Sequence, residues 1–332
     1  QVLLAFSGEG LNGLSRRLHG FLRKHILKQP AGWDRPPVLL NSWEALYMNF
    51  NEKRICSLAE EAAELSADLF VLDDGWFAGR TDDTKALGDW VPDPDKFPEG
   101  LEKTIDTAEN RGMAFGIWIE PEMISEDSDL FREHPEYAMT VPGRKPVMGR
   151  DQLMLDLSRP KVADNIYEQI ARLLEGGRIR YVKWDANRNL ADLCSPALPP
   201  ERQQELSHRY MLGLYSLLER LTEAFPDILF EGCSGGGGRF DAGMLYYFPQ
   251  IWGSDNTDAA ARLAIQRGYS YGYPPECVGA HISAVPNALT GRTAPLLLRA
   301  IAAMGGTFGM ELDPARLNTE EKRSEERRVG KE

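Results

Sequence analysis

The sequence predicts a (β/α)8 barrel, in which eight parallel strands alternate with helices and close into a cylinder. Short apolar runs alternate with amphipathic helical patterns from residue 37 onward, which is typical of β-α-β units and a parallel sheet. The alternations fall within residues 37–312, close to the roughly 250 residues of a typical barrel. An open, doubly wound sheet is the alternative that the same alternation allows.

Each predicted strand is a short apolar run bounded by polar or turn-forming residues. The runs are Val38–Trp43, Leu69–Asp74, Ala114–Ile119, Arg180–Asp185, Asp227–Gly232, Gln250–Asp255, Cys277–His281 and Gly306–Glu311. A further run, Leu153–Leu157, leads directly into a helix start at Ser158-Arg159-Pro160, and no long helix separates it from the third strand. We therefore expect this further run to be a piece of loop.

Helical spacing of apolar residues predicts the helices. An amphipathic helix over residues 11–27 is expected to precede the first strand. Asn51 is suited to cap the next helix, Pro160 to open another, and Asp258 to cap the helix Ala259–Arg267.

The chain divides into three predicted parts. Residues 1–36 are expected to form a connecting helix and linker, residues 37–312 the barrel, and residues 313–332 a charged tail with little apolar surface to bury. The chain does not begin with Met, and its opening QVLLAFSGEG lacks the pattern of a secretory signal. We therefore expect a segment of a longer protein.

Composition excludes several classes of function. The 332 residues are 42% hydrophobic and 27% charged, which is ordinary globular composition. Fifty acidic residues against 38 basic give a net charge of -12, which disfavours nucleic acid and anionic membrane surfaces as partners. No apolar run approaches the roughly 20 residues of a membrane-spanning helix.

The spacing of the cysteines and histidines indicates neither disulfides nor a metal site. The four cysteines, Cys56, Cys194, Cys233 and Cys277, form no close pairs in sequence, which favours a reducing, cytoplasmic compartment. The five histidines are isolated from one another and from the cysteines. We therefore expect no metal site and no cofactor.

Polar and aromatic side chains recur where the predicted strands end. In a barrel this edge carries the active site, because the C-terminal ends of all the strands meet there. Any one of these residues alone could be a turn residue or a helix cap. Six strands with the same feature favour an active site, and the residues are Asn41, Trp43, Asp73, Asp74, Trp118, Glu120, Lys183, Asp185, Glu231, Cys233 and Asp255.

The fourth strand places a cation and a carboxyl group together. Alternate side chains of a strand share a face, so Tyr181, Lys183 and Asp185 are expected to point the same way. An ammonium beside Asp185 would lower the pKa of that carboxyl and keep it ionised, which suits a nucleophile or an electrostatic stabiliser. A purely structural ion pair is the alternative interpretation.

A second carboxyl group is needed as a proton donor, and Asp255 is better placed than Asp258, which the helix cap explains. One ionised and one protonated carboxyl group form the usual pair that cleaves a glycosidic bond. Asp73 and Asp74 can accept hydrogen bonds from hydroxyl groups. Tryptophans near the strand ends could stack on a sugar ring or belong to the core: Trp43, Trp76, Trp90, Trp118 and Trp252.

Two other motifs are weaker indicators of function. The run Gly235–Gly238 lacks the Lys-Ser/Thr of a phosphate-binding loop and follows the fifth strand, so a turn against a ligand is expected. Cys233 has no histidine near it in sequence, so we expect it to line the pocket and not to act as a nucleophile.

Together these motifs resemble the retaining α-galactosidases of glycoside hydrolase family 36, particularly the bacterial type. The matching segments, in family order over residues 36–312, are Leu39-Leu40-Asn41-Ser42-Trp43-Glu44, Leu72-Asp73-Asp74-Gly75-Trp76-Phe77, Gly116-Ile117-Trp118-Ile119-Glu120-Pro121-Glu122-Met123, Tyr181-Val182-Lys183-Trp184-Asp185-Ala186-Asn187-Arg188, Glu231-Gly232-Cys233-Ser234-Gly235-Gly236 and Ser254-Asp255-Asn256-Thr257-Asp258.

The resemblance implies hydrolysis of terminal α-D-galactosyl residues of melibiose, raffinose and related oligosaccharides without a cofactor. It implies that Asp185 is the nucleophile, that Asp255 is the general acid/base, and that Asp73 and Asp74 bind the galactose 4- and 6-hydroxyls. It also implies further pocket residues: Trp43, Trp118, Arg150, Lys183, Asn187, Cys233 and Gly236.

Members of the family carry a β-sandwich domain before the barrel and a small β domain after it, and the full-length protein is expected to be a homo-oligomer. Three alternative functions fit the same barrel. They are an α-N-acetylgalactosaminidase, a galactosyl-transferring synthase and a non-catalytic galactoside-binding module. The binding module would have lost Asp185 or Asp255, and both are present.

Overall fold

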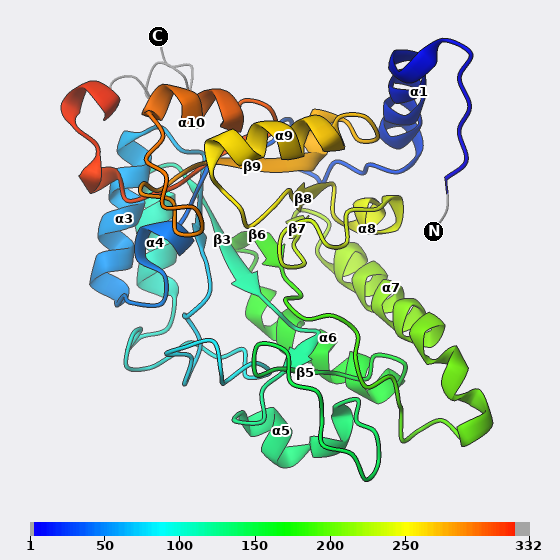
Figure 1. Cartoon of the computed structure of the whole chain (residues 1–332). Helices are drawn as coiled ribbons and strands as arrows, with labels where there is room; N and C mark the ends of the chain where they lie inside the picture. The colour runs from blue at the N-terminus through cyan, green and yellow to red at the C-terminus, as the bar shows by residue number, and fades with distance from the viewer. Residues whose placement is uncertain (1–2, 323–332) are drawn as a thin grey trace.

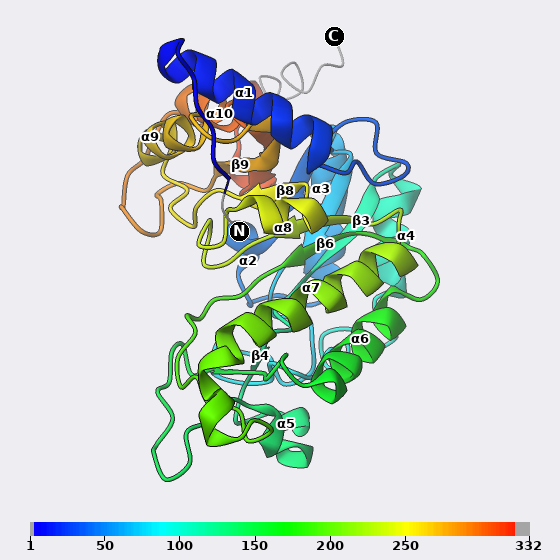
Figure 2. The same ribbon diagram turned by 90° about the vertical axis from the view of Figure 1, so that its right-hand side faces the viewer.

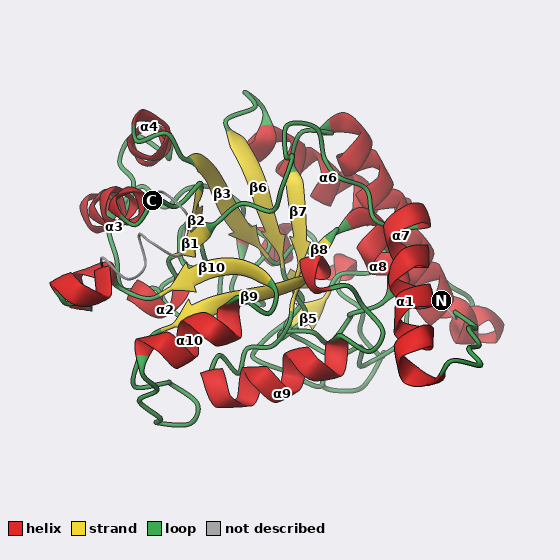
Figure 3. Cartoon of the chain, turned by 90° about the horizontal axis from the view of Figure 1, so that it is seen from above, coloured by secondary structure: helices red, strands yellow, loops and turns green. Residues whose placement is uncertain are grey.

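The predicted barrel is present in the computed structural model, which describes residues 3–322. Its parallel strands are β1 (Leu39–Asn41), β2 (Leu69–Leu72), β3 (Ala114–Ile119), β6 (Ile179–Trp184), β7 (Leu229–Gly232), β8 (Gln250–Trp252), β9 (Val278–Ser283) and β10 (Thr307–Glu311). They follow this order around the sheet, which Figure 3 shows from above. The sheet closes where β1 pairs with β10, with Leu39 opposite Gly309. The barrel prediction is therefore confirmed, and the open sheet is wrong.

A second, two-stranded sheet lies outside the barrel. Strand β4 (Met123–Ile124) pairs antiparallel with β5 (Leu153–Met154). The run Leu153–Leu157, which was expected to be loop, therefore begins with a short strand. An antiparallel pair can form from two residues on each strand. The run does not join the barrel sheet.

The helices surround the barrel (Figure 1). They are α1 (Gly10–His25), α2 (Trp43–Leu46), α3 (Glu52–Glu64), α4 (Glu102–Asn110), α5 (Asp129–Glu133), α6 (Pro160–Leu174), α7 (Leu206–Ala224), α8 (Ala242–Tyr247), α9 (Ala259–Tyr269) and α10 (Leu296–Ala303). The predicted helix starts are confirmed. Asn51 accepts a hydrogen bond from Arg54 N at 3.1 Å, Asp258 accepts one from Ala260 N at 3.3 Å, and Pro160 is the first residue of α6.

The ends of the described chain lie on the outside of the barrel. Helix α1 runs across one end of the molecule (Figure 2) and is tied to the segment after α9, where Arg23 pairs with Glu276 at 2.5 Å. At the other end Asp313 pairs with Arg54 of α3 at 2.9 Å. Of the predicted charged tail, residues 323–332 lie outside the described residues. No helix in residues 3–322 is long and apolar enough to cross a membrane.

The barrel interior has a small apolar part and a larger polar part. One apolar cluster, which comprises Leu39, Leu69, Val71, Tyr181 and Leu229, fills part of the interior. Val182 and Trp184 belong instead to the main cluster between the strands and the helices, as the alternation of β6 requires. Buried polar groups occupy the interior nearer the strand ends, including Lys183, Glu231, Gln250, His281 and Glu311. Lys183 and Glu311 also line a pocket at this end of the barrel.

Candidate active site

A pocket of about 90 Å³ opens at the C-terminal ends of the barrel strands. It brings together the predicted catalytic and sugar-binding residues except Gly236, whereas the strand-end candidates Asn41, Glu120 and Glu231 are buried and do not line it. Its lining is Trp43, Glu44, Asp73, Asp74, Trp118, Arg150, Lys183, Asp185, Asn187, Cys233, Trp252, Asp255, Thr257 and Glu311. Gly236 lies directly beside it with φ +86°, and a Cβ there would come within 2.8 Å of Asp255 N. Only glycine fits such a close approach between two backbones.

Asp185 is held in one orientation by N–H donors. Its Oδ2 accepts hydrogen bonds from Asn187 Nδ2 at 2.7 Å and from Trp118 Nε1 at 3.3 Å. Its Oδ1 accepts from Ala186 N at 2.8 Å and from Gly235 N at 3.4 Å. The glycine run predicted to turn against a ligand therefore also supports this carboxylate.

Asp255 differs from Asp185 in its surroundings. Asp255 is more exposed than Asp185, and its Oδ1 accepts a hydrogen bond from Trp252 Nε1 at 3.1 Å. Desolvation by the surrounding protein raises the pKa of Asp255, and the negative charge of Asp185 raises it further. Lys183, Trp252 and Arg150 offset part of this increase. One carboxyl group is thus fixed as an acceptor, while the other is biased towards holding a proton.

Lys183 shares a face with Asp185 as predicted, but its ion pair lies elsewhere. Its Nζ is 2.8 Å from Asp73 Oδ2, and both side chains are buried. The long lysine side chain spans the barrel interior to β2, where Asn41 Nδ2 also donates to Asp73 Oδ2 at 2.6 Å. Nearby carboxylates, first among them Asp73, raise the pKa of Lys183 well above its ordinary value against the effect of burial. The predicted pairing of Lys183 with Asp185 is therefore replaced by a pairing with Asp73.

Asp74 has a cationic partner that the sequence did not reveal. Arg80, which is fully buried, donates from Nε to Asp74 Oδ1 at 3.0 Å and from Nη2 to Oδ2 at 2.8 Å. Burial raises the pKa of Asp74, and the bidentate arginine opposes that rise. Each carboxylate oxygen has more than one lone pair, so Asp73 and Asp74 keep acceptor capacity towards the pocket.

Three pocket residues were missed by the sequence prediction. Glu44 accepts hydrogen bonds from Thr257 Oγ1 at 2.5 Å and from Ala284 N at 2.9 Å. Burial, together with the charge of Glu311, raises the pKa of Glu44 to about 7. Burial likewise raises the pKa of Glu311 to about 8. Glu311 ends the last predicted strand, so the strand-end pattern could have identified it, whereas Glu44 and Thr257 lie in helix α2 and a loop.

Two of the five tryptophans lie away from the pocket. Trp76 donates from Nε1 to Trp118 O at 2.8 Å, and Trp90 packs against Trp118 with ring centroids 6.3 Å apart. Both are buried in the core. A sugar-stacking role is therefore wrong for Trp76 and Trp90, which contact Trp118 within the core. The other three tryptophans line the pocket: Trp43, Trp118 and Trp252.

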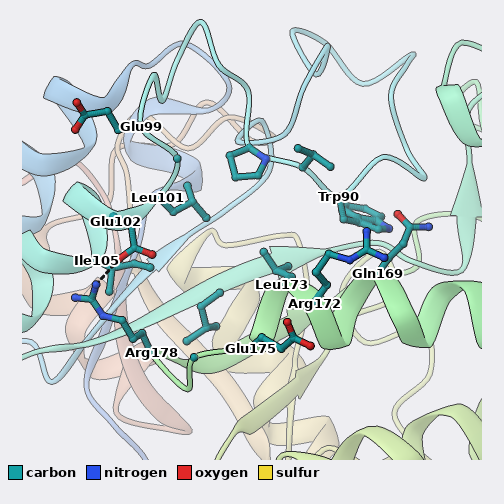
Figure 4. Close-up of a pocket in the computed structure, with 15 residues that line it drawn as sticks. Trp90, Glu99, Leu101, Glu102, Ile105, Gln169, Arg172, Leu173, Glu175 and Arg178 are labelled. Atoms are coloured by element: carbon teal, nitrogen blue, oxygen red, sulfur yellow. Dashed lines mark hydrogen bonds and ion pairs between the residues drawn. The ribbon is translucent and has the colours of Figure 1, made fainter.

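A larger cavity of about 420 Å³ lies on the flank of the barrel, between α4 and α6 (Figure 4). Trp90, Leu101, Arg172 and Arg178 are among its lining residues. Apart from Trp90, none of the residues predicted for the active site lines it. Within residues 3–322, no cluster of three or more His, Cys, Asp or Glu side chains is placed to bind a metal ion.

A (β/α)8 barrel with two carboxyl groups in different environments in one pocket at the strand ends is an arrangement that glycoside hydrolases use. Comparison with known proteins gives the family. The melibiase family model matches residues 1–331. The chain therefore belongs to the melibiase family, in glycoside hydrolase family 36.

Individual relatives are similar over almost the whole chain. α-Galactosidase 1 of Pediococcus pentosaceus is 50% identical over 329 residues, which cover 99% of this chain and 45% of the relative. The crystal structure of the family 36 α-galactosidase AgaA of Geobacillus stearothermophilus superposes with a TM-score of 0.94 at 51% identity, covering 96% of this chain and 45% of that one. An AgaA variant in complex with raffinose gives a TM-score of 0.93. The chain thus spans about half the length of these relatives.

Proposed function

We propose that this barrel hydrolyses terminal α-D-galactosyl residues of oligosaccharides of the melibiose and raffinose type, with retention at the anomeric carbon. The observation that carries the proposal is the pairing of Asp185 and Asp255 in one pocket, where N–H donors hold the Asp185 carboxylate and the surroundings raise the pKa of Asp255. The relatives named α-galactosidase, and the AgaA variant bound to raffinose, support the choice of sugar.

The first half of the reaction forms a covalent galactosyl-enzyme. Asp255 donates its proton to the oxygen of the leaving group while Asp185 Oδ attacks C1, so that the glycosidic bond breaks as the ester bond forms. The leaving group departs as a neutral alcohol. The N–H donors around Asp185 hold its carboxylate in place for this attack.

The second half of the reaction hydrolyses the galactosyl-enzyme, and in it Asp255 changes from acid to base. Once Asp185 is esterified it carries no negative charge, so one cause of the raised pKa of Asp255 disappears. Asp255 then acts as a base and removes a proton from water, which attacks C1 and releases Asp185. The structure thus provides a physical reason for the same residue to serve as acid and then as base.

The galactose hydroxyls are proposed to bind where Asp73 and Asp74 line the pocket. Asp73 and Asp74 accept hydrogen bonds from the 4- and 6-hydroxyls, and their cationic partners Lys183 and Arg80 keep them aligned. The remaining proposed contacts come from Trp43, Trp118, Arg150, Asn187, Cys233 and Gly236. No cofactor takes part in the proposed reaction.

NMR of the first turnovers tests the proposal. With an aryl α-galactoside, the α anomer of galactose should appear first and the β anomer later by mutarotation. If the β anomer appears first, the double displacement is wrong. If no galactose forms although the protein binds it, the chain is a binding module and not an enzyme.

We also infer a cytoplasmic location and a homo-oligomeric full-length protein. All four cysteines are free thiols, which favours a reducing compartment. Cell fractionation and light scattering of the purified protein test these two inferences.

A further inference from the structure

The segment that ends β3 contacts the loops after β6 and β7 through alternate side chains. Trp118 donates to Asp185, as described above. Two residues further, Glu120 is completely buried and is not among the residues that line the pocket. Glu122, two residues further again, accepts both Nη groups of Arg239 at 2.9 and 2.7 Å. The proposed chemistry uses neither glutamate.

Glu120 is linked to the proposed nucleophile through one residue. Its Oε1 accepts a hydrogen bond from Asn187 N at 2.5 Å. The side chain of the same residue, Asn187, donates from Nδ2 to Asp185 Oδ2 at 2.7 Å. The other oxygen of Glu120, Oε2, accepts a hydrogen bond from Gln152 Nε2 at 3.4 Å.

We propose that Glu120 is a positioning residue, which fixes the backbone of Asn187 so that the Asn187 amide holds Asp185 aligned for attack on C1. The proposal rests on the function proposed above. Without an acceptor at Glu120, the backbone N–H of Asn187 loses its buried partner, and the loop moves to satisfy it. A displacement of about 1 Å at a reacting group can cost on the order of 100-fold in rate.

The charge state of Glu120 is consistent with this role. Burial, together with the negative charges of Asp185 and Asp74, raises its pKa to about 8. At neutral pH Glu120 is therefore mostly uncharged, and it accepts the Asn187 hydrogen bond without placing a second negative charge behind Asp185.

Paired substitutions of similar volume test the proposal. Glu120→Leu removes the acceptor, and kcat on an aryl α-galactoside should fall by about 10- to 100-fold with KM changed by less than about threefold. Glu120→Gln keeps a carbonyl acceptor and should retain kcat within about threefold. Asn187→Ala, which also removes a proposed sugar contact, should lose at least as much as Glu120→Leu, and the double variant should be no worse than Asn187→Ala alone. Gln152→Leu, a substitution at the other buried partner of Glu120, is the matched control and should stay within about twofold.

Two results would overturn the proposal: equal kcat for the Leu and Gln variants, or losses that multiply in the double variant. Glu120→Met, whose flexible side chain fills the same space, replaces the Leu variant if that one does not fold. Crystal structures supply a readout that needs no turnover. The contact between Asn187 Nδ2 and Asp185 Oδ2 should persist in Glu120→Gln and be lost in Glu120→Leu, and its persistence in both would refute the positioning role. Failure of the proposed function shows instead as an inactive wild type.

Discussion

Glu311→Gln should make the stability of the protein less sensitive to alkali. Glu311 is buried beside the proposed active site, and its pKa of about 8 lies well above the ordinary value of 4.5. The folded state therefore holds a proton that the unfolded state releases. The contribution of Glu311 to stability is fully present below about pH 4.5 and is lost as the pH rises through 8.

The magnitude follows from the two pKa values. Across pH 6.5 to 8 the difference in proton binding amounts to about 2 kcal/mol of unfolding free energy for one such group, at about 1.4 kcal/mol per pH unit where the difference is complete. The pH range starts at 6.5 because of His281, whose pKa is lowered by burial to about 3. His281 makes stability rise with pH between about 3 and 6.5, and its effect on the pH dependence fades above 6.5.

Urea unfolding at pH 6.5, 7.25 and 8 measures the effect. The wild type should lose stability over this range, because Glu44 and Glu120 also have raised pKa values. Glu311→Gln should lose about 2 kcal/mol less, since glutamine keeps the polar contact that Glu311 Oε2 makes with His281 Nδ1 at 3.0 Å and does not titrate. Parallel stability curves for wild type and variant would refute the assignment of a neutral Glu311.

Three further substitutions have defined outcomes. Asp185→Ala should abolish turnover while galactose binding, measured by calorimetry, persists; residual turnover above about 1% would contradict the nucleophile assignment. Asp255→Ala should retain activity on an aryl galactoside with a good leaving group. Azide should increase that activity and yield a galactosyl azide. Normal kinetics of this variant on melibiose would show that Asp255 is not the acid. Arg80→Met should destabilise the fold by about 3–5 kcal/mol in chemical unfolding, because Asp74 would remain buried without its bidentate partner, and a loss below about 1 kcal/mol would contradict this.

The sequence was sufficient for the barrel because each strand is an apolar run and each helix carries its own cap or apolar face. Asn51, Pro160 and Asp258 act locally, within three residues of the groups that they satisfy. The strand-end pattern identified most pocket residues for a similar reason, since the C-terminal ends of parallel strands converge at one edge of the barrel.

Contacts across the barrel were not predictable in this way. Lys183 bonds Asp73 and not its strand neighbour Asp185, because a long side chain in a closed barrel reaches a strand that is distant in sequence. The partnership of Arg80 with Asp74 depends on the path of a loop. The raised pKa values of Glu44 and Glu311 arise from burial, which the alternation of residues along a single strand does not reveal.

During turnover Asp185 should become covalently bonded to the sugar. A slowly hydrolysed fluorinated α-galactosyl donor, followed by peptide mass spectrometry, measures this directly. One added glycosyl group is expected on the peptide that contains Asp185, and none in Asp185→Ala. A glycosyl group on the peptide that contains Asp255, with Asp185 unmodified, would contradict it.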